Sequence, residues 1–281
     1  MEFFKSNKIY DFMGKRLPFL GISALLVIAS IVLLFTKGLN FGVDFAGGTI
    51  VQVQYEKKAP INDIRDILND TKFNGSSITK FGSDEEIVIK IRSSSSDVSN
   101  DMGDQIRKLL VATGDFKIRR VDMVGPKVGD ELREKGLMAL GLSLIVILIY
   151  VSYRFEWRFA IASILALAHD VTIALGAISL VGVEVNLDIL AAILTILGYS
   201  LNDTIIVFDR IREGVQTSKE SILEKVVNES VSKTLSRTTL TSLTTFFVVA
   251  TLYFFGGEII NGFAFTLLVG VVVGTYSSIF I

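Results

Sequence analysis

The sequence contains no cysteine, and this absence excludes disulfide bonds, thiolate catalysis and cysteine-ligated metal sites together. It also has little net charge, −1 at pH 7, because 28 lysines and arginines face 29 aspartates and glutamates. Without a global basic field, we expect no nucleic-acid partner. Apolar residues, by contrast, are abundant: they make up 50% of the 281 residues, and the mean hydropathy is +0.54. This composition favours the membrane-protein class.

Six segments are close to or above the length of about 18 to 20 residues that a helix needs to cross the hydrocarbon of a bilayer. They span 17–36, 136–153, 160–181, 187–208, 240–255 and 263–281. The first is too long for a removed signal peptide and lacks the small-residue cleavage site. We therefore predict a multi-pass α-helical membrane protein with six transmembrane helices.

The distribution of lysine and arginine predicts the orientation of these helices. Positive residues gather in the tail 1–16, in the turn 154–159 and in the connection 209–239. The turns on the opposite side, "GVEVN" and "GGEIING", contain none. Because positive residues are retained on the cytoplasmic side, we expect both termini to be cytoplasmic.

The connection 209–239 has an amphipathic pattern. Its apolar residues recur at helical spacing: Ile222, Leu223, Val226, Val227, Val231 and Leu235. The pattern predicts a helix that lies at the membrane interface or against a partner. A helix that only links two spans is the alternative.

The polar segment 37–135 has the size of a small domain and lies on the side opposite to the termini, which makes it periplasmic. Its sequence predicts strands at "TIVQVQY", "SSITKFG", "EEIVIKIR" and "FKIRRVDMV". Helices are predicted at "INDIRDILND" and "VSNDMGDQIRKLLVATG". The order βαββαβ is that of an α+β ferredoxin-like domain.

This domain shows no metal-ligand cluster, no Ser/His/Asp set and no phosphate-binding loop. The glycines of "FAGGT" lack the spacing and the following helix of a nucleotide-binding loop. We therefore expect no metal and no cofactor, and we interpret the domain as a binding or lever domain. Gly42, Gly47 and Gly48 are candidates for its hinge, with turn or bulge residues as the alternative role.

Several long motifs occur in a fixed order along nearly the whole chain. They are "GLNFGVDFAGGT", "VGPKVGDEL", "FEWRFA", "LAHDV", "GYSLNDTIIVFDRIRE", "SRTTLTSLTT" and "FFGGEIINGFAFTLLVGVVVGTYSSI". Together they resemble the SecF branch of the SecD/SecF family of protein-export membrane proteins, which is related to the proton-driven RND transporters. The sequence stops before the polar carboxy-terminal tail that is usual in that family.

The resemblance implies a transport subunit of the bacterial inner membrane and no enzymatic activity. It implies a hetero-complex with SecD, whose six spans complete a twelve-helix pseudo-symmetric unit. Association with the SecYEG channel, and with YajC and YidC, is implied as well. The implied activity is to use the proton-motive force to pull unfolded polypeptide outward late in translocation, after the ATPase SecA has acted.

Ionisable side chains inside membrane spans cost about 2.5 to 3.5 kcal/mol on insertion scales, so they usually face protein or water. His169 and Asp170 lie near the middle of the third span, where interhelical hydrogen bonding and a proton relay are both open. Asp203 lies roughly 7 Å inside the cytoplasmic end of the fourth span. The resemblance implies a proton relay made by Asp203 and Arg237, with a positive-inside anchor as the alternative role of Arg237.

Other polar residues could support this relay. Asn202 precedes the carboxylate, and Thr241, Thr244 and Thr245 continue a polar face along the fifth span. Earlier in the fourth span, Gly198 and Ser200 would allow close helix approach. The arginines of "DRIRE" are interpreted as topology anchors.

Two functions of other classes compete with this interpretation. Asp170 and Asp203 could form the dyad of an intramembrane aspartyl protease, but that chemistry needs two carboxylates close enough to share a proton. The estimated depths of the two differ, and "GYSLND" is not the Gly-x-Gly-Asp context of that class. An RND-type exporter of a small molecule or lipid would need a substrate pocket, and it would act without the Sec channel.

Overall fold

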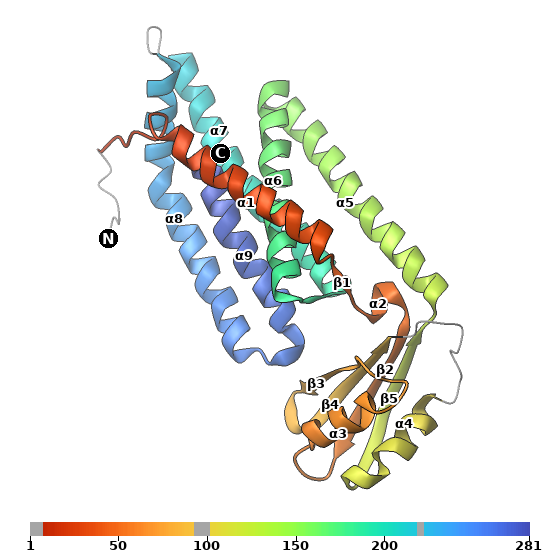
Figure 1. Ribbon diagram of the computed structural model, residues 1–281. Helices are drawn as coiled ribbons and strands as arrows, with labels where there is room; N and C mark the ends of the chain where they lie inside the picture. The colour runs from red at the N-terminus through yellow and green to blue at the C-terminus, as the bar shows by residue number, and fades with distance from the viewer. Residues whose placement is uncertain (1–7, 93–101, 218–221) are drawn as a thin grey trace.

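The computed structural model describes residues 8–92, 102–217 and 222–281, and it divides into a bundle of long helices and an α/β domain at one end of them (Figure 1). Six helices within the described residues are long and apolar enough to cross a membrane. They are α1 (Arg16–Thr36), α5 (Pro126–Arg154), α6 (Trp157–Val181), α7 (Leu187–Thr217), α8 (Leu223–Phe255) and α9 (Glu258–Phe280). The predicted six-helix membrane architecture is confirmed.

Three of these helices are longer than the spans read from hydropathy. α5 begins ten residues before the predicted 136, at Pro126, and α7 continues to Thr217. The amphipathic segment is the first part of α8, which runs without a break into the fifth span. No glycine or proline lies within α8, so nothing ends the helix at the membrane surface.

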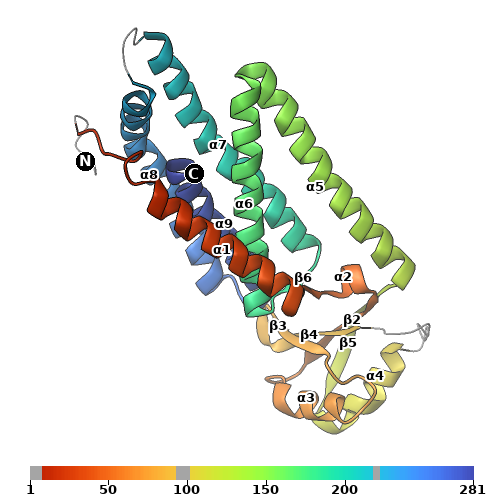
Figure 2. The same cartoon turned by 45° about the horizontal axis from the view of Figure 1, so that its top comes forward.

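The outer and inner helices of the bundle differ in burial. In the most apolar stretch of each helix, half of the residues of α6 and of α7 are buried, whereas 11% of those of α1 and of α5 are. α1 lies across α6, and α5 forms an antiparallel hairpin with α6 (Figure 2). The exposed apolar side chains of α1 and α5 therefore form the surface that a lipid environment would cover.

Small residues bring the inner helices together. A Cβ placed on Gly270 of α9 would lie 2.2 Å from Ile196 of α7, and one on Gly274 would lie 3.0 Å from Ser200. In the same way, the side chain of Ser30 of α1 packs where a Cβ on Gly176 of α6 would lie. Van der Waals packing at such close approaches is what associates helices in a membrane.

The α/β domain has one four-stranded sheet and two helices. Its elements are β2 (Gly48–Tyr55), α3 (Ile61–Asn69), β3 (Ser77–Phe81), β4 (Ser83–Arg92), α4 (Met102–Leu110), the short 3₁₀ helix η1 (Val111–Thr113) and β5 (Phe116–Val124). The strand order is β3-β4-β2-β5 with every neighbour antiparallel, as the ferredoxin-like βαββαβ prediction requires. The first residues predicted for the second helix, before Met102, lie outside the described residues.

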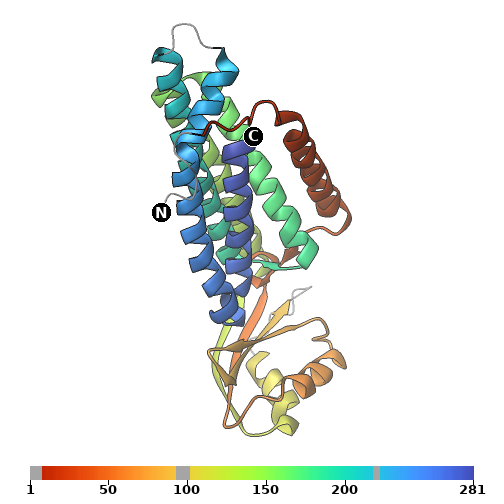
Figure 3. The same ribbon diagram turned by 90° about the vertical axis from the view of Figure 1, so that its left-hand side faces the viewer.

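Alternation along the strands separates the two faces of this sheet. One face buries Val51, Val53, Ile87 and Ile89 against the apolar sides of α3 and α4. The intervening side chains, such as Gln52, point the other way and face a space that the first residues of α9 also line. Figure 3 shows the domain next to the ends of the membrane helices. Because successive strand residues face opposite sides, the polar face is left open.

A short junction connects the bundle to the α/β domain. β1 (Asn40–Phe41) pairs in parallel with β6 (Glu184–Val185), and α2 (Val43–Ala46) follows β1. Oδ2 of Asp44 accepts a hydrogen bond of 3.1 Å from the backbone N–H of Leu187, the first residue of α7. The junction thereby fixes the beginning of α7 against the segment that follows α1.

The amino-terminal residues just before α1 lie along α8. Oδ1 of Asn228 accepts hydrogen bonds of 2.9 Å from the N–H groups of both Phe12 and Met13. The N–H of Tyr10 donates to the hydroxyl of Ser232, and Arg16 forms a 2.8 Å ion pair with Glu224. The amphipathic part of α8 therefore contacts the chain's own tail as well as α7.

Candidate functional site: buried carboxylates of the helix bundle

Asp203 lies on the buried face of α7, and 3% of it is exposed. Two groups of α8 lie near its carboxylate: the hydroxyl of Ser242 and the guanidinium of Arg237. Thr275 of α9 donates a hydrogen bond of 2.8 Å to Ser242. Asp203 therefore stands where α7, α8 and α9 meet.

Arg237 is near Asp203, but Arg237 itself is exposed on the surface of α8. Among the ion pairs of the described residues, none joins the two side chains. Asp203 and Arg237 are thus brought together as neighbours, in an arrangement without direct pairing.

The threonines that were predicted to continue this polar face have another use. The hydroxyls of Thr241, Thr244 and Thr245 donate to backbone carbonyls of α8 itself, one turn back. Thr241 is exposed, and so is Asn202 on α7. Ser242, one position along from Thr241, is the residue of α8 that is buried beside Asp203.

Asp170 of α6 forms a second cluster and is completely buried. Its Oδ2 accepts hydrogen bonds from the hydroxyls of Ser200 on α7, at 2.5 Å, and Ser277 on α9, at 2.8 Å. Its Oδ1 lies 2.8 Å from Nδ1 of His169. One carboxylate thereby connects three helices, as the hydrogen-bonding interpretation of Asp170 expects.

The ring of His169 extends this cluster to α1. It stacks on Tyr276 of α9, with 6.4 Å between the ring centroids. The hydroxyl of Tyr276 donates to the backbone carbonyl of Phe19 and accepts from the hydroxyl of Ser23, both on α1. The side chain of His169 is 9% exposed, and its buried Nε2 has no hydrogen-bond partner among the residues that the structure describes.

The two carboxylates have different neighbours. Asp170 binds Ser200, Ser277 and His169, whereas Asp203 faces Ser242 and Arg237. No hydrogen bond between the carboxylates occurs among the described residues, so they do not share a proton in the way that an aspartyl-protease dyad does.

Apart from Ser200, the serines and threonines around these carboxylates were not singled out from the sequence. Ser242, Thr275 and Ser277 come from spans far along the chain from Asp170 and Asp203. A partial signal exists in the spacing, since Gly270, Gly274 and Ser277 mark one small-residue face of α9.

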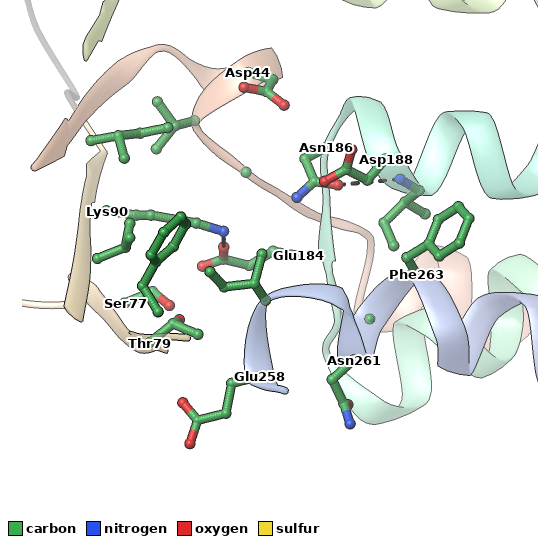
Figure 4. A pocket seen from close by; sticks show the side chains of 18 of the residues that line it. Asp44, Ser77, Thr79, Lys90, Glu184, Asn186, Asp188, Glu258, Asn261 and Phe263 are labelled. Atoms are coloured by element: carbon green, nitrogen blue, oxygen red, sulfur yellow. Dashed lines mark hydrogen bonds and ion pairs between the residues drawn. The ribbon is translucent and has the colours of Figure 1, made fainter. Parts of the chain in front are cut away.

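A cavity of about 510 Å³ lies between the open face of the sheet and the ends of the membrane helices. Lys90 of β4 reaches across it to Glu184 at 3.3 Å, as Figure 4 shows. The Lys80 N–H donates to Oε2 of Glu258, at the start of α9, at 3.0 Å. The α/β domain therefore contacts the bundle through these polar groups at the edge of the cavity.

At this junction Gly47 and Gly48 have φ of +79° and +151°. A Cβ on Gly48 would lie 2.2 Å from the carbonyl oxygen of Ile91, and one on Gly47 would lie 3.0 Å from Cα of Pro126. Gly42 has an ordinary φ of −77°. Gly47, just before β2, and Gly48, its first residue, thus lie in close contact with other backbone, and their use as a hinge stays a prediction.

Comparison with known proteins places this geometry in a family. Residues 105–281 match the model of the protein export membrane protein SecD/SecF, C-terminal region, and residues 32–59 match the SecD/SecF GG motif. The protein translocase subunit SecF of Helicobacter pylori J99 is 48% identical over 100% of this chain and 87% of its own length. That of Escherichia coli O157:H7 is 41% identical over 98% of this chain and 86% of its own.

A crystal structure of SecDF from Thermus thermophilus, described as a translocon-associated membrane protein, superposes with a TM-score of 0.85 at 36% identity. The match covers 99% of this chain and 38% of the SecDF chain. SecDF in a super-membrane-facing form superposes with a TM-score of 0.75 at 37% identity, over 98% of this chain and 38% of that one. By sequence and by fold, the chain belongs to the SecD/SecF family of protein-export membrane proteins.

Proposed function

We propose that this chain is the SecF half of a proton-driven SecD–SecF unit that assists the late steps of protein translocation across the bacterial cytoplasmic membrane. One observation carries the proton-driven part: Asp203 is buried at the meeting point of three helices, with Arg237 near it and no ion pair between them. Burying an ionisable group at this depth costs free energy, and such groups in membrane spans usually mark an ion or proton pathway.

The switch works through two helix arrangements. When Arg237 approaches Asp203, the guanidinium stabilises the carboxylate and the proton leaves. When Arg237 withdraws, the charged carboxylate is left in a low-dielectric site and takes up a proton again. A membrane potential of about 100 mV supplies roughly 2.3 kcal/mol for each charge moved, which is enough to bias such an equilibrium.

The partner half binds at the exposed face of α7. A stripe of small and polar residues follows that face, at spacings of three and four residues: Ala191, Thr195, Gly198 and Asn202. Small residues and single amides are the side chains that membrane helices use to associate. The six spans of SecD would cover this stripe.

The α/β domain is the external lever in this scheme and holds emerging unfolded polypeptide. Its open sheet face, the cavity beneath it and the few polar contacts with Glu184 and Glu258 support a domain that can move relative to the bundle. The distribution of lysine and arginine supports cytoplasmic termini and a periplasmic lever. SecYEG is the channel served, and YajC and YidC are its further partners.

The test is export into membrane vesicles that contain the SecD complex of this chain. Asp203→Asn should preserve the fold and binding to SecD, because the side chains are nearly isosteric, while abolishing the stimulation of export by an imposed proton gradient. Arg237→Lys should weaken that stimulation, since lysine lacks the planar fork that pairs with a carboxylate. Translocation driven by ATP and SecA should continue in both variants.

Asp209→Asn is the matched control, because Asp209 lies on the same helix but is exposed at its end. Its stimulation by a proton gradient should equal that of the wild type. Full stimulation in vesicles with Asp203→Asn would eliminate the relay. Transport of a small molecule in the absence of the Sec channel would instead favour an exporter.

A further inference from the structure

Thr238 of α8 has a buried hydroxyl without a partner. The residue is 1% exposed, and its Oγ1 accepts or donates no hydrogen bond among the residues that the structure describes. Thr234 and Thr241 of the same helix behave differently, because their hydroxyls donate to backbone carbonyls one turn back. Leaving a buried hydroxyl unpaired costs free energy, so such a group normally binds a protein atom or an ordered water.

The packing of α8 on α7 places Thr238 at the depth of Asp203. The two helices follow each other in the chain and run antiparallel (Figure 1). Ser230 of α8 donates a hydrogen bond of 3.1 Å to the carbonyl of Arg210 on α7, which fixes their register. From Arg210 to Asp203 is about two turns of α7, and the same distance along α8 leads from Ser230 to Thr238.

Buried hydroxyls continue from Thr238 toward the predicted cytoplasmic end of α8. They recur every four residues, at Ser230, Thr234, Thr238 and Ser242, and each residue is 6% exposed or less. Four residues beyond Ser242 comes Phe246, so this hydroxyl row ends near Asp203 and leads to one side only. Helix neighbours at this spacing are about 5–6 Å apart. That separation fits two hydrogen bonds of about 2.7–2.8 Å with a water between the hydroxyls.

A cavity of about 130 Å³ lies between α7 and α8 where the hydroxyl row ends on the cytoplasmic side. Ser230 lines it together with Arg210, Glu213, Glu229 and Lys233. Arg210 pairs with Glu213 at 2.8 Å, and Lys233 lies 3.9 Å from Glu229. Arg210 and Lys233 are exposed, so the cavity reaches solvent. It is polar and large enough to hold several waters.

We propose that protons leave Asp203 along the hydroxyl row, past Thr238, Thr234 and Ser230, and enter the cytoplasm through this cavity. Asp203 gives its proton to a water at Thr238. Each hydroxyl or water accepts one proton and passes on the one that it held, because a hydroxyl both donates and accepts. The last water releases a proton to solvent, and no hydroxyl keeps a charge. The inference rests on the proposed proton-driven function and gives it an exit route.

Single cysteines can report water along the hydroxyl row, because the chain has no natural cysteine. A thiol buried in apolar surroundings stays protonated and inert, whereas a hydrated thiol reacts as the thiolate. Thr238→Cys, in complex with a cysteine-free SecD in lipid vesicles, should be modified by methyl methanethiosulfonate, and faster at higher pH. Val249→Cys, buried on the same helix beyond the row, should stay unmodified by mass spectrometry. An inert Thr238→Cys would overturn the proposal.

Export in the same vesicles supplies the functional readout. Thr238→Val keeps the shape of the side chain without its hydroxyl, and it should lose most of the stimulation by a proton gradient. Thr238→Ser restores a hydroxyl and should recover the stimulation. Thr251→Val is the matched control, because Thr251 is exposed on the same helix and donates to its own backbone. Equal losses in Thr238→Val and Thr238→Ser would show a packing role and would contradict the route.

The route and the relay can fail separately. Modification of Thr238→Cys needs no proton-driven activity, and it should persist when Asp203→Asn is added. Full stimulation in Thr238→Val, together with none in Asp203→Asn, would eliminate the route and leave the relay in place. Full stimulation in Asp203→Asn would eliminate the relay, and with it the reason for the route.

Discussion

Gly48 is the residue at which the backbone of the α/β domain tolerates least change. It begins β2, its φ is +151°, and its α-carbon faces the backbone carbonyl of Ile91 across the strand pair. Left-handed backbone of this kind is accessible to glycine and strained for other residues. The second glycine of the motif therefore has a steric reason that is independent of any hinge.

We expect Gly48→Ala to destabilise the α/β domain by more than the roughly 1–3 kcal/mol that strained backbone alone costs, because the new methyl also meets the Ile91 carbonyl. The measurement is the thermal midpoint of the purified protein. Gly125→Ala is the control, since no atom lies within 4 Å of a Cβ there and its φ is −67°. Equal midpoints for the two variants would contradict the steric argument.

The sequence located the two carboxylates and Arg237 but could not show how they are held. A charge inside an apolar segment is visible in one dimension because it breaks the pattern. Ser242 and Ser277 are not visible in this way, since serine is common in membrane helices and donates locally as readily as across helices. The sequence pattern indicates Thr241 as part of the polar face, but only the packing of α8 decides that its neighbour Ser242 is the buried one.

At the scale of elements, α8 combines two roles in one helix. Its first half binds the tail through Asn228, Ser232 and Glu224, and its second half is a membrane span beside Asp203. Continuity of the helix was not predicted, because hydropathy changes sharply where the helix leaves the hydrocarbon although the backbone does not break. The strands of the α/β domain were predicted well, because their alternation is a local signal.

Asn228→Ala should release the tail from α8. The substitution removes the acceptor of the Phe12 and Met13 amides, and each such hydrogen bond contributes about 1 kcal/mol. Amide hydrogen exchange of residues 10–14 should become faster, while exchange in α3 stays unchanged. Asn62→Ala, an exposed asparagine on α3, should leave exchange of the tail as it is. Unaltered protection of the tail in Asn228→Ala would contradict this contact.

The same contact predicts an effect of pH on the tail. Hydrogen bonds from the Gly14 amide and from Asn228 lower the pKa of the Asp11 carboxyl below its ordinary value. A lowered pKa stabilises the docked tail at neutral pH, and that contribution is lost as the pH falls through the ordinary pKa of aspartate, about 3.9, and then the lowered one. The protection of the Gly14 amide, measured relative to its intrinsic exchange rate at each pH, should fall over this acidic range, and Asp11→Asn should remove the fall.

At the scale of the whole molecule, the α/β domain and the bundle meet in a ring of polar contacts around a cavity. Glu184, next to the first turn of α7, pairs with Lys90 at 3.3 Å and with Arg92 at 3.5 Å. Ion pairs that remain partly solvated contribute little net stability, and they can be broken and remade. A contact of this kind is compatible with the movement that the proposed lever requires.

Fixing this contact should stop the lever. Lys80→Cys together with Glu258→Cys, joined by a flexible bifunctional thiol reagent, would tie β3 to α9, and no natural cysteine competes for the reagent. We expect the cross-linked protein to assemble with SecD and to lose proton-driven late translocation. Lys80→Cys alone, treated in the same way, should retain it. Undiminished export by the cross-linked protein would eliminate the lever.

The pairing of β2 with β5 brings together the two points at which the α/β domain is joined to the rest of the chain. Gly48, where the chain enters the sheet, is directly opposite Val124, where it leaves. Antiparallel partners have their α-carbons about 5 Å apart, so the entire α/β unit is inserted at a single point of the bundle. Such a unit can be gained, lost or exchanged by a short splice without disturbing α1 or α5. The helix bundle can therefore serve as a scaffold into which different external domains are inserted at this one position.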